Sequence, residues 1–167
     1  MMQAATLVLA VGNRSRGDDA IGPLLLERLG AELASAGRSG EFELIEDYQL
    51  QVEHALDLVG RRLALFIDAG CRTPTPLEFY AVAPTRGAAP GTHALSPQAL
   101  LQVYRQIEHA DPPPAYVLCV RGERFELGAG LSRAASRHFE AAWRRLALLC
   151  ARPEAAHWRA LSAATVE

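Results

Sequence analysis

The sequence VGNRSRGDDAIG, residues 11–22, joins an apolar run to a helix-like segment through two glycines separated by four residues. This spacing resembles a phosphate-binding loop, which continues with Lys and then Ser or Thr after its last glycine. Here Gly17 is followed by Asp18 and Asp19, so the turn carries carboxylates where a phosphate site carries a cation. The turn therefore predicts the strand-to-helix junction of an α/β protein, with a chemistry other than phosphate binding.

The segments on either side of the turn have the patterns of a buried strand and a helix. ATLVLAV, residues 5–11, is a continuous apolar run, typical of a strand that is buried on both faces. Apolar residues recur at helical spacing from Ile21 to Leu29, and Asp18 or Asp19 is expected to cap this helix. The same patterns predict further strands at 41–47, 63–69, 77–83 and 115–122, and further helices at 51–59, behind Ser96–Pro97 and behind Ser132.

The alternation of strands and helices predicts a three-layer α/β/α sandwich with a mostly parallel, twisted sheet of about five strands. Residues 70–76 are too few for the crossover that neighbouring parallel strands need. We therefore expect one antiparallel strand in this sheet. We expect a single α/β domain over residues 1–150, followed by a C-terminal tail at 151–167.

The composition is that of an ordinary globular protein, and it argues against several function classes. The 167 residues carry a net charge of −2, which gives no general attraction to nucleic acid or to an anionic membrane. All 17 basic residues are Arg, so lysine chemistry such as Schiff-base formation is excluded. The three cysteines lack a Cys-x-x-Cys spacing, which argues against a disulfide framework or a structural zinc site. With neither a signal peptide nor an apolar run of about 20 residues in evidence, we expect a cytoplasmic protein.

Candidate metal ligands follow two strands that the fold places side by side. Asp18 and Asp19 come directly after the first strand, and Asp68 ends the third. In an open α/β sheet ligands bind beyond the carboxyl ends of the strands, where the strand order reverses, and an order of 2-1-3 makes these two strands neighbours. His93, in the loop before Ser96, can reach the same edge. Two carboxylates and an imidazole suit Zn, Ni, Mn or Fe(II), and three protein ligands leave positions open for water or substrate.

Each of these residues also has a purely structural interpretation. One of Asp18 and Asp19 is expected to act as a helix N-cap, and Asp68 can simply mark the end of an apolar strand. A single histidine in a loop, such as His93, is commonly solvated. Cys71, three residues after Asp68, is a candidate soft ligand, but a small buried filler is the better interpretation. The remaining histidines fit helix faces, a turn and the tail, where we expect structural or exposed roles: His54, His109, His138 and His157.

Four segments together resemble the [NiFe] hydrogenase maturation proteases. VLAVGNRSRGDDAIGPLLLERL resembles the opening of that family, and LFIDAG resembles its third-strand Asp segment. THALSPQALLQVYR resembles its His-containing loop and helix, and RGERFELGAGLS resembles its last loop before the final helix. The match covers about residues 5–150 in order, and it is specific as a combination. EDYQLQVEHALDL, residues 46–58, is similar to the branch that serves NAD-linked, bidirectional hydrogenases.

The resemblance implies an endopeptidase that removes the C-terminal extension of a [NiFe] hydrogenase large-subunit precursor after nickel insertion. The family's metal-binding trio falls on Asp19, Asp68 and His93, which are also the candidate catalytic residues. Glu46 and Asp47 are weaker candidates for orienting the substrate. The nickel is expected to arrive on the precursor, because three ligands beside the positive end of a helix hold a cation only weakly. No organic cofactor is implied, and we expect a monomer without nucleic-acid or membrane partners.

Two other functions are compatible with the same residues. One is a metal-dependent aminopeptidase on a similar fold, although such enzymes usually need more ligands for a two-metal site. The other is a non-catalytic, nickel-sensing maturation chaperone, which would leave the precursor at full length. Arg14 stands where the family often has an aliphatic residue or Pro, which bears on local substrate contacts rather than on the metal trio. A shared metal ion requires that the side chains of Asp19, Asp68 and His93 lie within about 8 Å of one another at the carboxyl edge of the sheet.

Overall fold

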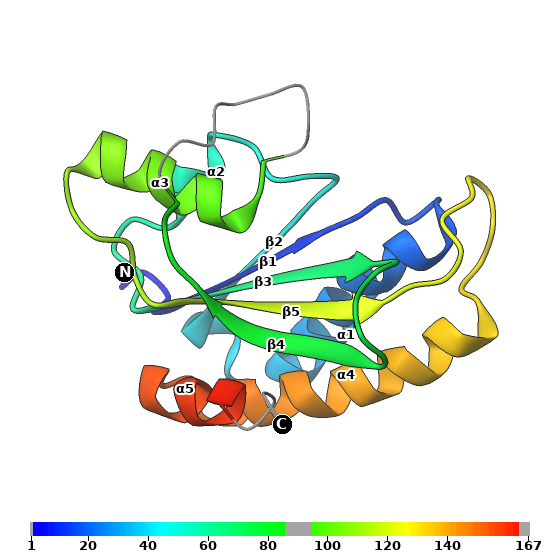
Figure 1. Cartoon of the computed structure of the whole chain (residues 1–167). Helices are drawn as coiled ribbons and strands as arrows, with labels where there is room; N and C mark the ends of the chain where they lie inside the picture. The colour runs from blue at the N-terminus through cyan, green and yellow to red at the C-terminus, as the bar shows by residue number, and fades with distance from the viewer. Residues whose placement is uncertain (1, 86–94, 164–167) are drawn as a thin grey trace.

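One twisted sheet organises the computed structural model, which describes residues 2–85 and 95–163 (Figure 1). Its strand order is β2-β1-β3-β5-β4, and all neighbouring pairs are parallel except the antiparallel pair of β4 and β5. The predicted mostly parallel sheet with one antiparallel strand, and the predicted order 2-1-3, are confirmed. The strands are Thr6–Val11 (β1), Phe42–Asp47 (β2), Leu63–Gly70 (β3), Leu77–Val82 (β4) and Ala115–Arg121 (β5).

Strand β4 lies at the edge of the sheet, next to β5 rather than next to β3. The connection at 70–76 carries the chain past β5, and Phe79 of β4 is paired with Leu118 of β5. The three central strands β1, β3 and β5 are buried along most of their length. This burial on both faces explains why their sequences are nearly continuous apolar runs.

Helices cover both faces of the sheet, as the three-layer prediction requires (Figure 1). Helices α1, α4 and α5 pack on one face around a core that includes Trp158, and α2 and α3 pack on the other around a core that includes Leu100. None of the helices within the described ranges is long and apolar enough to cross a membrane. The helices are Ile21–Ser35 (α1), His54–Asp57 (α2), Pro97–Glu108 (α3), Arg133–Ala151 (α4) and Ala155–Ala163 (α5).

The N-termini of the helices follow the predicted caps in two of three cases. Ser96 and Ser132 cap α3 and α4, where each hydroxyl accepts a hydrogen bond from the backbone N–H three residues later. Helix α1 differs, because a single 3₁₀ turn, Gly17–Ala20 (η1), precedes it and no side chain caps its first residues. The prediction that Asp18 or Asp19 caps this helix is therefore wrong, and both carboxylates have other partners.

The segment beyond residue 150, which the sequence predicts to be a C-terminal tail, contributes to the core through α5. Trp158 is completely buried, and its ring packs edge-on against Phe79 and Tyr116 with centroid distances of 6.3 and 5.6 Å. Its indole N–H donates a 2.9 Å hydrogen bond to the Leu149 carbonyl oxygen. These contacts join α5 to the underside of β4 and β5. The division of the chain at residue 150 stays a prediction.

Replacing Trp158 with Ala is expected to lower the free energy of unfolding by about 3–5 kcal/mol, because the substitution leaves a large cavity in a closed core. Urea denaturation followed by circular dichroism measures this loss. Arg159→Ala, an exposed position on the same helix, is the matched control and should leave stability nearly unchanged. A loss below about 1 kcal/mol for Trp158→Ala would show that α5 is dispensable for the fold.

Candidate functional site

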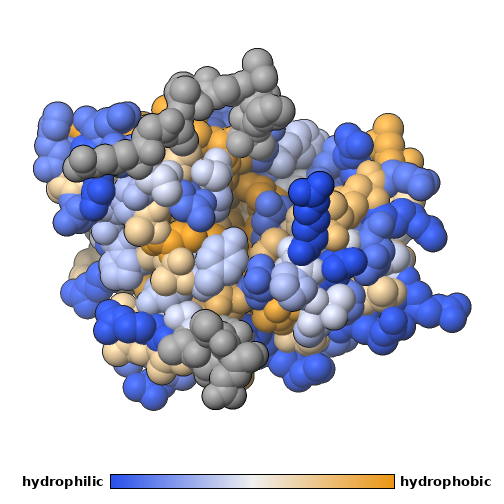
Figure 2. All heavy atoms as spheres, viewed as in Figure 1, coloured by the Kyte–Doolittle hydropathy of each residue, from blue (hydrophilic) through white to orange (hydrophobic). Residues whose placement is uncertain are grey.

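A cavity of about 340 Å³ opens at the carboxyl ends of β1 and β3, and two of the predicted metal ligands line it. Its polar lining includes the side chains of Asp19 and Asp68, and its remaining walls are mainly apolar. In Figure 2 apolar residues are visible in the middle of this face of the molecule, surrounded by hydrophilic side chains. The other lining residues are Leu9, Val11, Tyr48, Gln49, Leu50, Phe66, Ala69, Tyr80, Leu95, Pro97, Val117 and Cys119.

Asp68 occupies the cavity wall at the end of the buried part of β3. The pKa of its carboxyl group is raised from 3.8 to about 6, mainly by burial and to a smaller extent by the nearby charge of Asp19. A 2.7 Å hydrogen bond from the Ala69 N–H to Oδ1 acts in the opposite direction, because it stabilises the ionised form. A partly buried carboxylate with a second carboxylate close by is a site where a bound cation relieves electrostatic repulsion.

Asp19 reaches the same cavity from η1, in the turn after β1. Its Oδ2 accepts a 2.7 Å hydrogen bond from the Asn13 N–H. The chain approaches so closely here that a Cβ on Gly12 would overlap the Asp19 carbonyl oxygen, and Gly12 has a φ of +147°. The first glycine of the opening motif therefore provides the space in which the Asp19 backbone lies.

Asp18, directly before Asp19, is fully buried and bonded to a different part of the chain. Its carboxylate accepts hydrogen bonds from the Glu123 and Arg124 N–H groups at 2.7 and 2.9 Å, and from both the N–H and the hydroxyl of Ser132 at 2.7 Å. Burial alone would raise the pKa of Asp18, but these four bonds more than offset it and leave the pKa below its ordinary value. The two neighbouring carboxylates thus have different environments.

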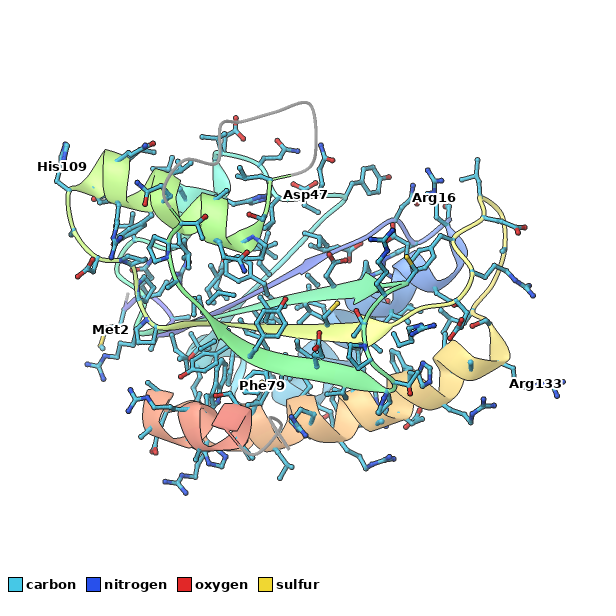
Figure 3. The ribbon with its side chains drawn as sticks, viewed as in Figure 1. Met2, Arg16, Asp47, Phe79, His109 and Arg133 are labelled. Atoms are coloured by element: carbon cyan, nitrogen blue, oxygen red, sulfur yellow. The ribbon has the colours of Figure 1, made fainter. Side chains whose placement is uncertain are left out.

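Glu46 and Asp47 have partners within the protein. Both oxygens of Glu46 accept hydrogen bonds from the Arg14 guanidinium, at 2.7 and 2.9 Å. Asp47 Oδ2 lies 3.2 Å from Nε2 of His54, a buried histidine whose Nδ1 accepts a hydrogen bond from the Gln51 N–H. Figure 3 labels Arg16, in the loop that follows β1, and Asp47, the last residue of β2. The substrate-orienting role of Glu46 and Asp47 stays a prediction.

Cys119, which no motif in the sequence marks as a site residue, lines the cavity. It is the register partner of Asp68 across the β3–β5 pair, and its Sγ lies 3.0 Å from the Thr73 hydroxyl. Burial raises the pKa of this thiol, so it is neutral at pH 7. Cys71, expected as a buried filler, is exposed instead, because it lies in the turn after β3. The sequence places Cys119 within a strand, but only the register of β3 and β5 brings it beside Asp68.

Within residues 2–85 and 95–163 no group of three or more His, Cys, Asp or Glu side chains is arranged to hold a metal ion. Two of the three predicted ligands, Asp19 and Asp68, are within the described residues, and both line this cavity. His93 lies outside the described residues. Leu95 and Pro97, which follow it closely in the sequence, line the same cavity.

Comparisons with known proteins establish the fold. No family model matches the chain, and no curated protein matches it. Among solved structures it is similar to the hydrogenase maturating endopeptidase HybD from E. coli, with a TM-score of 0.65, 20% identity and coverage of 91% of this chain and 93% of that one. It is also similar to the [NiFe] hydrogenase maturation protease HycI from Thermococcus kodakarensis, with a TM-score of 0.61, 23% identity and coverage of 86% and 90%. A hydrogenase 2 maturation peptidase from a Thaumarchaeota archaeon has a TM-score of 0.58, 22% identity and coverage of 87% and 96%.

Proposed function

We propose that this chain is an endopeptidase that removes the C-terminal extension of a [NiFe] hydrogenase large-subunit precursor after nickel insertion. The observation that carries the proposal is the meeting of Asp19 and Asp68 in one cavity at the carboxyl edge of β1 and β3. The fold is shared with hydrogenase maturation endopeptidases over most of the chain. The sequence segments that resemble that family contain the same two residues and His93.

The residues fit a cation that belongs to the substrate. Asp19 lies close enough to Asp68 for its negative charge to raise the pKa of Asp68, and a bound divalent metal would relieve this repulsion. His93 would supply the third ligand, and carboxylate and imidazole groups are suitable ligands for nickel. The open coordination positions would be filled by the precursor, which brings the nickel with it.

Asp68 has two possible roles in cleavage. As a ligand it would hold the precursor's nickel, which can polarise the scissile carbonyl group as a Lewis acid. As a general base it would accept a proton from the attacking water, a role for which a pKa of about 6 is well matched near neutral pH. Both roles need the ionised carboxylate, so processing should decline as the pH falls below about 6.

We also propose the narrower assignments that the sequence suggests. The resemblance of residues 46–58 favours a precursor from the NAD-linked, bidirectional type of hydrogenase, and Tyr48, Gln49 and Leu50 of this segment line the cavity. The protein would act as a monomer in the cytoplasm, where the precursor is its partner.

Intact-mass spectrometry after incubation with the nickel-loaded precursor tests the function. The endopeptidase proposal predicts one shortened large subunit and one intact released C-terminal peptide. A chaperone would leave the precursor at full length, and an aminopeptidase would shorten it stepwise from the N-terminus. Either of these two results would contradict the proposal.

Replacing His93 with Ala is expected to slow precursor processing about 100-fold or more, because loss of even a residue that orients a metal ligand costs about 10–100-fold. The fold should be retained. Circular dichroism and the unfolding midpoint measure this and should match those of the wild type. His157→Ala, on α5, is the matched control and should process the precursor normally. Equal initial rates for His93→Ala and the wild type would remove His93 from the site.

A further inference from the structure

The turn that carries Asp19 is fastened to the loop between β5 and α4, residues 122–132, by main-chain hydrogen bonds. The Asp18 N–H donates to the Arg124 carbonyl oxygen at 2.7 Å, and the Gly17 N–H donates to the Ala129 carbonyl oxygen at 3.1 Å. In the opposite direction, the Gly128 N–H donates to the Ser15 carbonyl oxygen at 2.7 Å. Two segments more than 100 residues apart in the sequence therefore form one structural unit.

Glycines allow this close contact. Gly17 has a φ of +56°, and a Cβ there would overlap the Arg124 carbonyl oxygen. A Cβ on Gly122 would lie 2.6 Å from the Phe125 ring and 3.1 Å from the Asp18 Cβ. Because no side chain fits at either position, the carboxylate of Asp18 can reach the loop backbone directly.

The Asp18 carboxylate is the centre of this contact. It receives four hydrogen bonds from the loop, two of which come from Ser132 at the N-terminus of α4. The Ser132 hydroxyl also accepts from the Ala135 N–H, so the cap of α4 and the anchor of the turn are the same group. Negative charge at a helix N-terminus is favourable, which adds to the strength of the anchor.

We infer that Asp18 is a positioning residue, which fixes η1 against the β5–α4 loop and thereby directs Asp19 into the cavity. The inference rests on the proposed function, because Asp19 is the group through which Asp18 would act. Asp18 is fully buried and does not line the cavity, whereas Asp19, one residue later in the same short turn, does. The main-chain bonds to the loop and the Asn13 N–H also hold this turn, and the Asp18 carboxylate adds four hydrogen bonds at the position directly before Asp19.

A double-mutant cycle on affinity tests the inference. The dissociation constant of fluorescently labelled, nickel-loaded precursor would be measured by anisotropy for the wild type, Asp18→Asn, Asp19→Asn and the double variant, at a temperature where all are folded. Each single variant is expected to bind about 10-fold more weakly or worse, and the double variant about as weakly as Asp19→Asn alone. Ser132→Ala, which removes one bond to Asp18, should show a smaller loss in the same direction.

Two controls separate positioning from a general effect on stability. Leu146→Ala, at a buried position of α4, should lower stability by about 2–5 kcal/mol and leave the dissociation constant unchanged. Hydrogen exchange at the Glu123, Arg124 and Ser132 amides should accelerate in Asp18→Asn but not in Asp19→Asn, a readout that needs no precursor.

The outcomes distinguish this inference from the proposed function. If the wild type binds the precursor and Asp18→Asn binds it equally well, or if the two losses add fully in the double variant, the positioning role is overturned and the proposed function stands. If the wild type itself neither binds nor processes nickel-loaded precursor, the proposed function fails, and with it any role of Asp18 in that reaction.

Discussion

Replacing Asp68 with Asn is expected to abolish precursor processing while making the folded protein more stable at neutral pH. The substitution preserves the shape of the side chain but removes the negative charge that either proposed role requires. The initial rate of processing should fall at least about 100-fold, the lower end of what a positioned acid or base contributes. Initial rates with nickel-loaded precursor measure this loss.

The gain in stability follows from the direction of the pKa shift at Asp68. Its pKa is about 6 in the folded protein and 3.8 as an ordinary carboxyl group, so folding favours the protonated form. This contribution to stability is complete below about pH 4 and is lost as the pH rises through about 6. At pH 7 the wild type therefore carries a penalty of about 2–3 kcal/mol that Asp68→Asn lacks.

Urea denaturation at pH 4 and pH 7 checks this second effect. The difference in unfolding free energy between Asp68→Asn and the wild type should be small at pH 4 and should favour the variant at pH 7. Asp111→Asn removes a strongly exposed carboxylate just after the C-terminus of α3; it is the matched control and should show neither effect. A variant that processes at the wild-type rate, or that is less stable than the wild type at pH 7, would contradict the account of Asp68.

A methyl group at position 12 is expected to destroy both the turn and the activity. Gly12→Ala places a Cβ where the Asp19 carbonyl oxygen lies, and it also forces a φ of +147° on a residue that disfavours it. Since backbone blocks the Cβ, η1 must move, and we expect a loss of about 3 kcal/mol or more in unfolding free energy. Processing should be lost even under conditions where the variant is folded.

Two other glycines serve as controls for Gly12→Ala. Gly37 also has a positive φ, +69°, but a Cβ there meets nothing within 4 Å, so Gly37→Ala should cost only the backbone term of about 1–2 kcal/mol. Gly40 has neither a positive φ nor a close neighbour, and Gly40→Ala should be nearly neutral. Both should process precursor normally. A Gly12→Ala variant as active as these controls would show that the close approach to Asp19 is unimportant.

Patterns within a segment predicted the sheet well. The continuous apolar run at 5–11 identified β1 as a strand buried on both faces, and each predicted strand end lies within one residue of the observed end. The short connection at 70–76 also predicted an antiparallel strand correctly. It did not reveal that β4 pairs with β5, because either neighbour satisfies the connection and only packing of the whole sheet decides between them.

Long-range contacts account for what the sequence did not reveal at the site. A local pattern of Asp before a helix predicts an N-cap, but Asp18 finds stronger partners more than 100 residues away, at Glu123, Arg124 and Ser132. Cys119 enters the cavity only because the register of β3 and β5 places it beside Asp68. Such contacts have no signal in the spacing of residues along one segment.

The dependence of cleavage on nickel tests the central claim most directly. Purified protein would be mixed with equal concentrations of nickel-loaded and metal-free precursor in separate reactions, and intact masses would be followed over time. Our account predicts one cut in the nickel-loaded precursor and no cleavage of the metal-free form, because the open positions beside Asp19 and Asp68 need a metal that the precursor supplies. Efficient cleavage of the metal-free precursor, whose chain is more accessible, would contradict nickel-dependent recognition.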